Sequence, residues 1–282
     1  MQNIGIFVNL ERDPELVAAK HTAAELISRG INVFVDEAYK PLLSHLDVTF
    51  LPHKEMINSV DLVVVLGGDG TILKVISDAA EADTPVIGIN LGHLGFLTQA
   101  EKDDSSFFDK IANSDFEINH FMMLEARIFK NGKVSNTVLA LNDIIFRGNG
   151  GKMLSLEVEV DGTVANRYLA DGVIVSTSTG STAYSLSCGG PIVHQSLDCM
   201  ILTPICPHTL KSRCIVIPPG SSVRLKFDPS YHNDATLKAD GIFAGDLADG
   251  DYIEILRATK RAPLAILDSH NYFDVIREKL SD

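Results

Sequence analysis

The stretch Leu62-Val63-Val64-Val65-Leu66-Gly67-Gly68-Asp69-Gly70-Thr71 decides the fold of this chain. Its five apolar residues, three of them β-branched, predict a strand that is buried on both faces. The glycines that follow let the backbone turn tightly and come close to a ligand. Asp69 therefore stands at a strand end, where open α/β sheets bind ligands and where bare backbone amides suit phosphate. The stretch predicts a site for a phosphorylated ligand.

Strand and helix patterns alternate through the first hundred residues. Strands are predicted at 4–8, 31–35, 62–66 and 85–89. One helix is predicted with Asp13 as its N-cap, Pro14 at its first position and its end near Gly30, and another over about 71–82. This βαβ alternation predicts a mainly parallel sheet.

The pattern changes after about residue 100. A short helix near 105–112 precedes alternating strands at 125–129, 156–160 and 223–227. The first two of these strands end in the hairpin signals Asn131-Gly132 and Asp161-Gly162. This region is therefore predicted to be β-rich and mostly antiparallel to about residue 255, with a terminal helix at 273–280.

The charge balance of the chain argues against two classes of partner. The 282 residues carry a formal net charge of -13, which gives no electrostatic footprint for nucleic acid or for an anionic membrane. The first residues lack a basic region, and no apolar run has the length of a membrane span. The four cysteines form no C-x-x-C pair, which favours reduced thiols. We expect a cytoplasmic protein that binds neither nucleic acid nor membrane.

A second glycine-rich strand end, at 90–98, strengthens the functional interpretation of the first. Strand ends from one sheet form opposite walls of a single crevice. The competing interpretation is a tight turn in which Asp69 complements a helix N-terminus. Neither a complete G-x-G-x-x-G nor a Walker A sequence is present. His93, in the second stretch, is expected to be a solvated loop residue.

Hydroxyl groups cluster at 176–187, around Gly180 and directly after a predicted strand. The segment from Ala183 could open a helix whose free amides point at an anion, and the alternative is an ordinary turn. Ser181 lacks the G-x-S-x-G surroundings of a hydrolase nucleophile. Asn142-Asp143 and Asp240-Gly241 also present polar groups at strand ends, where either ligand contacts or Asx turns are open.

Together these stretches closely resemble the NAD kinase family, in its bacterial type that uses ATP or polyphosphate. The resemblance rests on 67–71, 90–97, Asn142-Asp143, Asp171-Gly172, 179–191 and 203–210. It implies an α/β domain of residues 1–100 plus 256–282 and a β-rich domain of residues 101–255, with the active site between them. The implied reaction is phosphorylation of the 2′-hydroxyl of the adenosine ribose of NAD, giving NADP.

The resemblance also implies roles for individual residues. Asp69 matches the catalytic proton acceptor, which a poorly nucleophilic secondary hydroxyl needs. Asn142 and Asp143 are assigned to the NAD adenosine and Asp171 to the nicotinamide side. The donor phosphates of ATP are expected along the glycine loop, with Mg²⁺ or another divalent cation bridging their oxygens and no direct protein ligand assigned. The nucleotide- and substrate-binding set is Gly67, Gly68, Gly70, Thr71, Phe96, Asn142, Asp143, Asp171, Thr182, Ala183, Tyr184, Ser185, Leu186 and Ser187.

The chain departs from the family pattern at two positions. Ser178 stands where members often have proline, which predicts a less rigid loop, and Ile242 stands where glutamine is common. The roles of Arg147, Lys152, Asp240 and Ile242 therefore stay open. The resemblance further implies a homo-oligomer, a tetramer or a dimer. Two alternatives remain: a lipid kinase of the diacylglycerol or sphingosine type, which shares the first motif, and a dinucleotide sensor without turnover.

Overall fold

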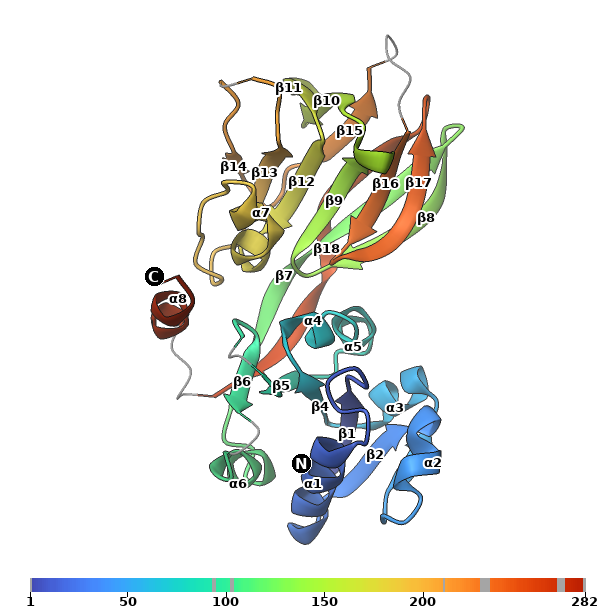
Figure 1. Ribbon diagram of the computed structural model, residues 1–282, viewed down its shortest axis with the longest axis vertical. Helices are drawn as coiled ribbons and strands as arrows, with labels where there is room; N and C mark the ends of the chain where they lie inside the picture. The colour runs from blue at the N-terminus through green and yellow to red at the C-terminus, as the bar shows by residue number, and fades with distance from the viewer. Residues whose placement is uncertain are drawn as a thin grey trace. The chain divides into compact units, whose positions relative to one another are not determined.

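The computed structural model describes residues 2–92, 95–101, 104–209, 211–228, 234–267 and 272–280, and it divides into two compact units (Figure 1). Unit 1 comprises Met1–His120 and Ala262–Asp282, and unit 2 comprises Phe121–Arg261. The limits expected near residues 100 and 255 fall short of these, since the helix at 106–112 joins the core of unit 1. His93, Leu94 and Leu210 lie outside the described residues.

Unit 1 is built on a parallel sheet with the strand order β3-β2-β1-β4-β5, and the four predicted strands are confirmed. The strand β6 and the end of β18 pair with β5. The bounds are β1 Asn3–Val8, β2 Asn32–Asp36, β3 Thr49–Leu51, β4 Leu62–Gly67, β5 Val86–Asn90, β6 Thr98–Glu101 and β18 Tyr252–Ile266. As the apolar run predicts, every residue of β4 is buried.

Helices cover both faces of this sheet. On one face α1 (Val17–Ser28) and α6 (Ser106–Ala112) share a core with the alternate residues Leu62, Val64 and Leu66 of β4. On the other face, α3 (His53–Ser59) packs against β1 and against α5 (Ile76–Ala82). The shorter helices of unit 1 are η1 Glu37–Tyr39, α2 Lys40–Leu43 and α4 Asp69–Ile72, and its last helix is α8 Tyr272–Leu280.

The predicted start of the first helix is wrong. The helix α1 begins at Val17 because Leu16 adopts a left-handed conformation with φ 55°. Asp13 still caps the helix from four residues away, since its carboxylate accepts the Val17 N–H at 2.7 Å and the Ala19 N–H at 3.0 Å. Pro14 therefore lies before the helix and not at its first position.

The predicted helix at 71–82 is two helices. The helix α4 begins earlier, at Asp69, and ends at Ile72, and α5 follows from Ile76. Between them the Lys74 N–H donates to the Thr71 carbonyl and the Val75 N–H to the Ile72 carbonyl. These bonds span three residues and not four, so the backbone tightens and the helix is interrupted.

Unit 2 consists of two antiparallel layers around one core, which confirms the predicted β-rich region. One sheet has the order β14-β13-β12-β9-β16-β17, and the strands β11-β10-β15-β18 belong to the other layer with the β7–β8 hairpin. Buried side chains from both layers form a single cluster. The bounds are β7 Glu117–Lys130, β8 Lys133–Ala140, β9 Asp143–Gly148, η2 Asn149–Gly151, β10 Leu154–Val160, β11 Thr163–Ala170, β12 Gly172–Thr177, η3 Thr179–Thr182, α7 Tyr184–Ser187, β13 Met200–Ile205, β14 Ile215–Ile217, β15 Val223–Phe227, β16 Asp234–Ala239 and β17 Ile242–Ala248.

Three hairpins of unit 2 turn on an acid or amide followed by glycine. Asn131-Gly132 and Asp161-Gly162 have positive φ at both residues, which is the type I′ geometry that their sequence predicts. Asp240-Gly241 joins β16 to β17 in the same way, with φ 49° and 79°. The third turn fixes the direction of the Asp240 side chain, which matters for the site described below.

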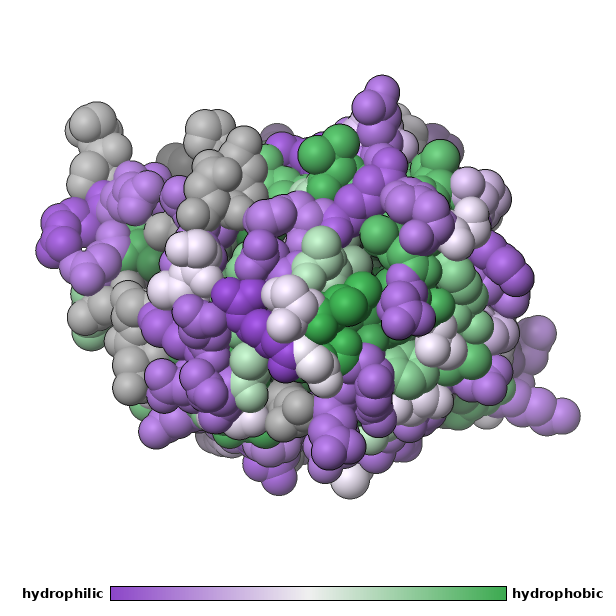
Figure 2. All heavy atoms as spheres, turned by 90° about the horizontal axis from the view of Figure 1, so that it is seen from below, coloured by the Kyte–Doolittle hydropathy of each residue, from purple (hydrophilic) through white to green (hydrophobic). Residues whose placement is uncertain are grey.

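The surface is largely polar where Figure 2 shows it, with hydrophobic side chains gathered in one patch right of the centre. No helix in the described part of the chain is both long enough and apolar enough to cross a membrane. All four cysteines are free thiols, as the sequence predicts.

Candidate functional site

Asp69 joins the two glycine-rich strand ends of unit 1. Its Oδ2 accepts the Phe96 N–H at 2.8 Å, and its Oδ1 accepts the N–H groups of Leu97 at 3.0 Å and Thr98 at 3.3 Å. The parent strands are adjacent and parallel, with Gly67 opposite Asn90. The predicted adjacency of the two strand ends is therefore confirmed. Asp69 also lies in the first turn of α4, as the competing interpretation expects, but its carboxylate accepts its hydrogen bonds from the second loop.

At two glycines of this site an added Cβ would clash with the protein, whereas at two others it would lie in open space. A Cβ at Gly67 would lie 2.2 Å from the Thr71 hydroxyl, and a Cβ at Gly95 would lie 1.8 Å from Asp69 Oδ1. A Cβ at Gly68 or Gly70 would meet nothing within 4 Å. Gly67 and Gly95 are thus required by packing, whereas Gly68 and Gly70 expose backbone to an incoming ligand.

Two asparagines at the ends of β1 and β5, the strands on either side of β4, have no individual role in the sequence-based prediction. Asn9, directly after β1, donates from Nδ2 to the Thr71 hydroxyl at 3.2 Å. Asn90, at the end of β5, is 3% exposed, and its Nδ2 has no hydrogen-bond partner among the described residues. A buried donor without a partner costs free energy unless a ligand or water satisfies it. Their position directly after predicted strands was the only available signal.

Phe96 packs against the C-terminal helix of unit 1. Its ring centroid lies 6.2 Å from that of Tyr272, and Lys279 Nζ lies 4.9 Å from the Phe96 centroid. The Phe96 side chain therefore holds α8, while its backbone amide holds Asp69.

Asp240 and the backbone of residues 141–143 form a buried carboxylate clamp at the start of β9 in unit 2. Asp240 Oδ2 accepts the Leu141 N–H at 2.7 Å, and Oδ1 accepts the N–H groups of Asn142 at 2.8 Å and Asp143 at 3.0 Å. Asp240 thus holds the predicted pair Asn142-Asp143 from a turn almost a hundred residues away. The Asx-turn alternative for Asp240 is replaced by this long-range role.

The carboxyl groups of Asp143 and Asp240 both have raised pKa values. Burial, followed by the nearby charge of Asp240, raises the pKa of Asp143 from 3.8 to about 7. Burial also raises the pKa of Asp240 to about 6, although its three backbone donors oppose the shift. Near neutral pH the pair therefore carries less than two full negative charges.

The stability of the protein should fall with rising pH because of Asp143. Its pKa is raised in the folded state, so its favourable contribution is complete below 3.8 and is lost as pH rises through about 7. We expect Asp143→Asn to increase the free energy of unfolding at pH 8 by at least about 1.4 kcal/mol, the equivalent of one pKa unit. Urea denaturation at pH 5 and pH 8 measures this. The exposed Asp246→Asn is the control, and equal stabilities of wild type and Asp143→Asn at pH 8 would contradict the expectation.

The hydroxyl cluster after β12 is anchored to this clamp. Thr177 donates to the Leu141 carbonyl at 2.6 Å and accepts the Gly180 N–H at 3.0 Å. A Cβ at Gly180 would lie 2.0 Å from the Asn142 carbonyl oxygen. Ser178 has φ -59°, close to the value that proline imposes, and is buried. The loop is therefore tied to the clamp by Thr177 despite the serine.

The hydroxyls of Ser181 and Ser185 are occupied by the protein. Ser181 Oγ donates to the Val193 carbonyl at 3.1 Å and accepts the Val193 N–H at 3.0 Å, so it serves as a structural bridge and not as a nucleophile. Ser185 is buried and bonds the Thr203 hydroxyl at 2.9 Å. Thr182, Ala183, Tyr184 and Leu186 are half-buried, and Ser187 is exposed.

A cavity of about 410 Å³ brings Arg147 and Tyr184 together with Lys238 in unit 2. The glycines of 148–151 form part of its wall. Arg147 Nη2 lies 3.6 Å from Asp171 Oδ2, so the predicted Asp171 stands beside a cation. Lys152 Nζ lies 3.5 Å from Asp234, and Ile242 is 53% exposed. Two cations at a glycine-lined hollow suit an anionic ligand.

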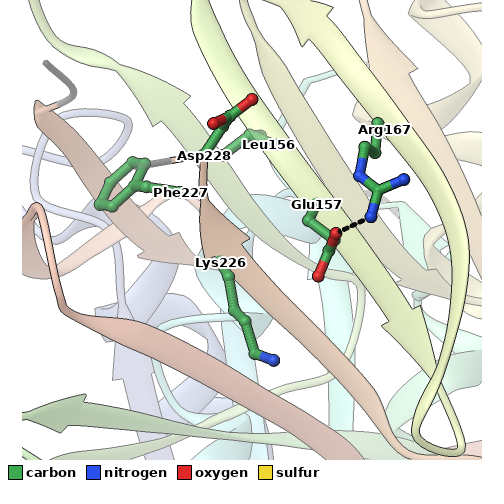
Figure 3. A pocket seen from close by; sticks show the side chains of 6 residues that line it. All are labelled: Leu156, Glu157, Arg167, Lys226, Phe227 and Asp228. Carbon is green, nitrogen blue, oxygen red and sulfur yellow. Dashed lines mark hydrogen bonds and ion pairs between the residues drawn. The ribbon is translucent and has the colours of Figure 1, made fainter. Parts of the chain in front are cut away.

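Another hollow of unit 2, about 330 Å³ in volume, differs in character (Figure 3). In this hollow Arg167 Nη2 donates a hydrogen bond to Glu157 Oε2 at 2.6 Å, which Figure 3 shows as a dashed line. Lys226 forms an ion pair with Glu159. These charges neutralise one another within the protein, and its described lining contains no residue of the predicted site.

The described residues contain no group of three or more histidine, cysteine, aspartate or glutamate side chains arranged to hold a metal ion. Asp69 supplies one carboxylate at the glycine loop.

Comparison with known proteins identifies relatives over the full chain. The model of the ATP-NAD kinase N-terminal domain matches residues 4–114, and that of the ATP-NAD kinase C-terminal domain matches residues 141–267. An NAD kinase of Symbiobacterium thermophilum is 38% identical and covers 100% of this chain and 99% of the relative. One of Caldanaerobacter subterraneus is 37% identical, with 100% of both chains covered.

Two solved structures are also similar. Yeast NADH kinase complexed with NADH has a TM-score of 0.89 and 30% identity, over 99% of this chain and 87% of the yeast chain. An NAD kinase from Archaeoglobus fulgidus in complex with ATP has a TM-score of 0.76 and 25% identity, over 99% of this chain and 98% of the other.

Proposed function

The chain belongs to the NAD kinase family, and on that premise we propose that it phosphorylates the 2′-hydroxyl of the adenosine ribose of NAD with ATP as donor. The product is NADP. One observation in the structure carries the proposal: the Asp69 carboxylate is fixed at a strand end beside two glycines whose backbone is open to a ligand.

Asp69 is proposed as the catalytic base. A carboxylate offers about four lone-pair directions, and the three observed backbone donors leave one for the proton of the ribose hydroxyl. As that oxygen forms its bond to the terminal phosphorus, Asp69 takes the proton. The bond from this phosphorus to its bridging oxygen breaks, and ADP leaves with the electron pair.

The glycine loop is proposed to hold the donor phosphates along Gly67, Gly68 and Gly70. Its amides carry no charge, and the chain as a whole is acidic. Mg²⁺ or a similar cation, bound through the phosphate oxygens, would neutralise their charge and polarise the transferred group. Hard cations take carboxylate and phosphate oxygens, so this loop with Asp69 is compatible with that arrangement.

The dinucleotide is proposed to bind to unit 2. Asn142 and Asp143 would meet the adenosine, Asp171 the nicotinamide side, and residues 182–187 the dinucleotide backbone. The cavity at Arg147, Tyr184 and Lys238 supports this proposal, since it offers two cations for a pyrophosphate. Because Asp143 is 3% exposed, it would act mainly through the backbone that it and Asp240 shape.

The test is formation of NADP from ATP, Mg²⁺ and NAD by the purified chain, measured with an NADP-specific dehydrogenase. We expect NADP to appear, and we expect none when the metal is chelated. A parallel reaction with diacylglycerol tests the lipid kinase alternative, which the polar, hydroxyl-rich segment 180–187 does not favour. Lipid phosphate without NADP would overturn the proposal. Binding of NAD without any NADP would instead support the sensor alternative.

The family further suggests a cytoplasmic homo-oligomer, a tetramer or a dimer, that supplies NADP. Mass measurement in solution tests the assembly.

A further inference from the structure

Three cysteines of unit 2, Cys188, Cys206 and Cys214, form a thiol cluster at the end of α7. The Cys188 N–H donates to the carbonyls of Tyr184 at 3.2 Å and Ser185 at 3.1 Å, which fixes this cysteine directly after the helix. Its thiol is half-buried, and Cys206 and Cys214 lie close enough to interact with it electrostatically. Neither the proposed transfer of phosphate nor the proposed binding of NAD uses these thiols.

The Cys214 thiol contacts the backbone next to Cys188. Its Sγ–H donates to the Gly189 carbonyl at 3.4 Å, and Gly189 directly follows Cys188 in the chain. A thiol is a weak hydrogen-bond donor, so little is lost when this contact is exchanged for a covalent bond. Cys214 and Cys188 are both half-buried, so neither thiol is closed to a small reagent.

The strands beneath α7 hold Cys214 in this position. Leu202 lies opposite Ile215 in the antiparallel ladder of β13 and β14, and the next step of the ladder places Cys214 beside Thr203. The Thr203 hydroxyl bonds that of Ser185, on α7, at 2.9 Å. Residues that lie opposite each other in a ladder point to the same face of the sheet, so Cys214 faces α7 as Thr203 does.

The thiol cluster is coupled to the proposed dinucleotide site through Tyr184. Burial raises the pKa of the Cys188 thiol, and a hydrogen bond with the Tyr184 hydroxyl opposes that rise. Tyr184 also lines the cavity of about 410 Å³ together with Arg147 and Lys238. A bond from Cys188 to another sulfur therefore takes a hydrogen-bond partner away from a side chain in the wall of this cavity.

We propose that Cys188 and Cys214 form a reversible oxidation site, and that their disulfide weakens the binding of NAD. The effect on NAD rests on the proposed kinase function. The formation of the disulfide does not depend on that function and is tested separately.

A small disulfide such as oxidised glutathione is the oxidant. The Cys214 thiolate attacks one of its sulfur atoms, and a glutathione thiolate leaves with the electron pair of the broken S–S bond. The Cys188 thiolate then attacks the Cys214 sulfur of this mixed disulfide, and the second glutathione leaves. The two protein thiols are oxidised and lose their protons, while one oxidised glutathione is reduced to two thiols. Because the pKa of Cys188 is raised, its attack should become faster as pH rises.

The first test locates the bond. The wild type is treated with oxidised glutathione, its remaining thiols are alkylated, and it is digested with trypsin without reduction. Trypsin leaves Cys188 and Cys206 on the peptide 168–211 and Cys214 on the peptide 214–224. Mass spectrometry should find these two peptides linked, with fragmentation placing the link at Cys188. A bond within the first peptide, or no bond at all, would overturn the proposal.

The second test measures the KM for NAD before and after oxidation. We expect it to rise roughly two- to tenfold in the wild type, the effect of losing about one hydrogen bond, and to return after treatment with dithiothreitol. The KM for ATP should not change. Cys214→Ser cannot form the bond, so its KM for NAD should stay at the value of the reduced wild type under the same treatment.

Cys206→Ser is the matched control, since Cys206 belongs to the cluster but not to the proposed pair. It should respond to oxidation as the wild type does. A response that is lost in Cys206→Ser, or a KM for NAD that oxidation leaves unchanged in the wild type, would contradict the inference. If the wild type made no NADP in either state, the kinase function would be refuted, whereas the linked peptides would still establish the oxidation site.

Discussion

Asp69→Asn should still bind NAD and should lose at least ~10² in turnover, the lower end of the usual gain from general-base catalysis. The amide oxygen can still accept a backbone N–H, but the side chain no longer takes the proton of the ribose hydroxyl. Binding is measured by calorimetry and turnover by NADP formation at saturating ATP and NAD. A fall in turnover with intact NAD binding separates proton transfer from recognition of the acceptor.

Asp61→Asn is the matched control for this variant. Asp61 also accepts two backbone N–H groups, from Gln2 at 2.9 Å and Asn3 at 3.0 Å, and it lies in the same unit but on the surface. It should keep wild-type turnover. If Asp69→Asn also turned over at the wild-type rate, Asp69 would not be the base.

Gly95→Ala should lose activity to a similar degree without altering any ionisable group. Its Cβ would lie 1.8 Å from Asp69 Oδ1 and 2.7 Å from the Thr98 hydroxyl, so the carboxylate or the second loop must move. Overpacking of this kind costs roughly 1–3 kcal/mol of stability, and it also displaces the proposed base. We expect kcat/KM to fall at least ~10², the scale associated with misplacing a catalytic group by about 1 Å.

Two comparisons identify the cause of that loss. Gly220→Ala places its Cβ in open space and should be neutral. In the double variant with Asp69→Asn, the second substitution should add little, because both act on one carboxylate. Fully multiplicative losses would show that Gly95 acts independently of Asp69.

The sequence allowed the strands and the hairpin turns to be predicted because their causes are local. An apolar run of five residues can only be buried on both faces, and Asp161-Gly162 suits a conformation that most residues avoid. The fold class and the pairing of the two glycine-rich strand ends follow from those elements. The family resemblance supplied the reaction.

The errors arose where distant residues determine the local structure. Leu16 is left-handed and completely buried, and this tertiary arrangement delays the start of α1 beyond the cap that Asp13 suggested. Asp240 is a turn residue, as its sequence predicts, but its carboxylate also binds backbone amides about a hundred positions earlier. A pattern confined to neighbouring residues contains no information about such contacts.

The candidate site was predicted only in part, because distant residues also determine which of its side chains are free to bind a ligand. Asp69 was singled out by its position after a strand, but its three amide donors come from the other glycine-rich segment. The sequence predicts Ser185 as a binding residue and leaves Ser181 without a catalytic role. In the structure, the hydroxyl groups of both serines form hydrogen bonds within the protein. We therefore propose that both hydroxyls hold the loop in place and that the other residues of 182–187 meet the ligand.

The discontinuous composition of unit 1 has a consequence for biosynthesis. Ala265 and Leu267 belong to its core, and Leu264 pairs with Val86, so the unit lacks part of its interior until the ribosome has made nearly the whole chain. Unit 2, by contrast, is complete in sequence at Arg261. Since domains generally fold as units during synthesis, the nascent glycine loop acquires its final packing only after the β-rich unit has emerged.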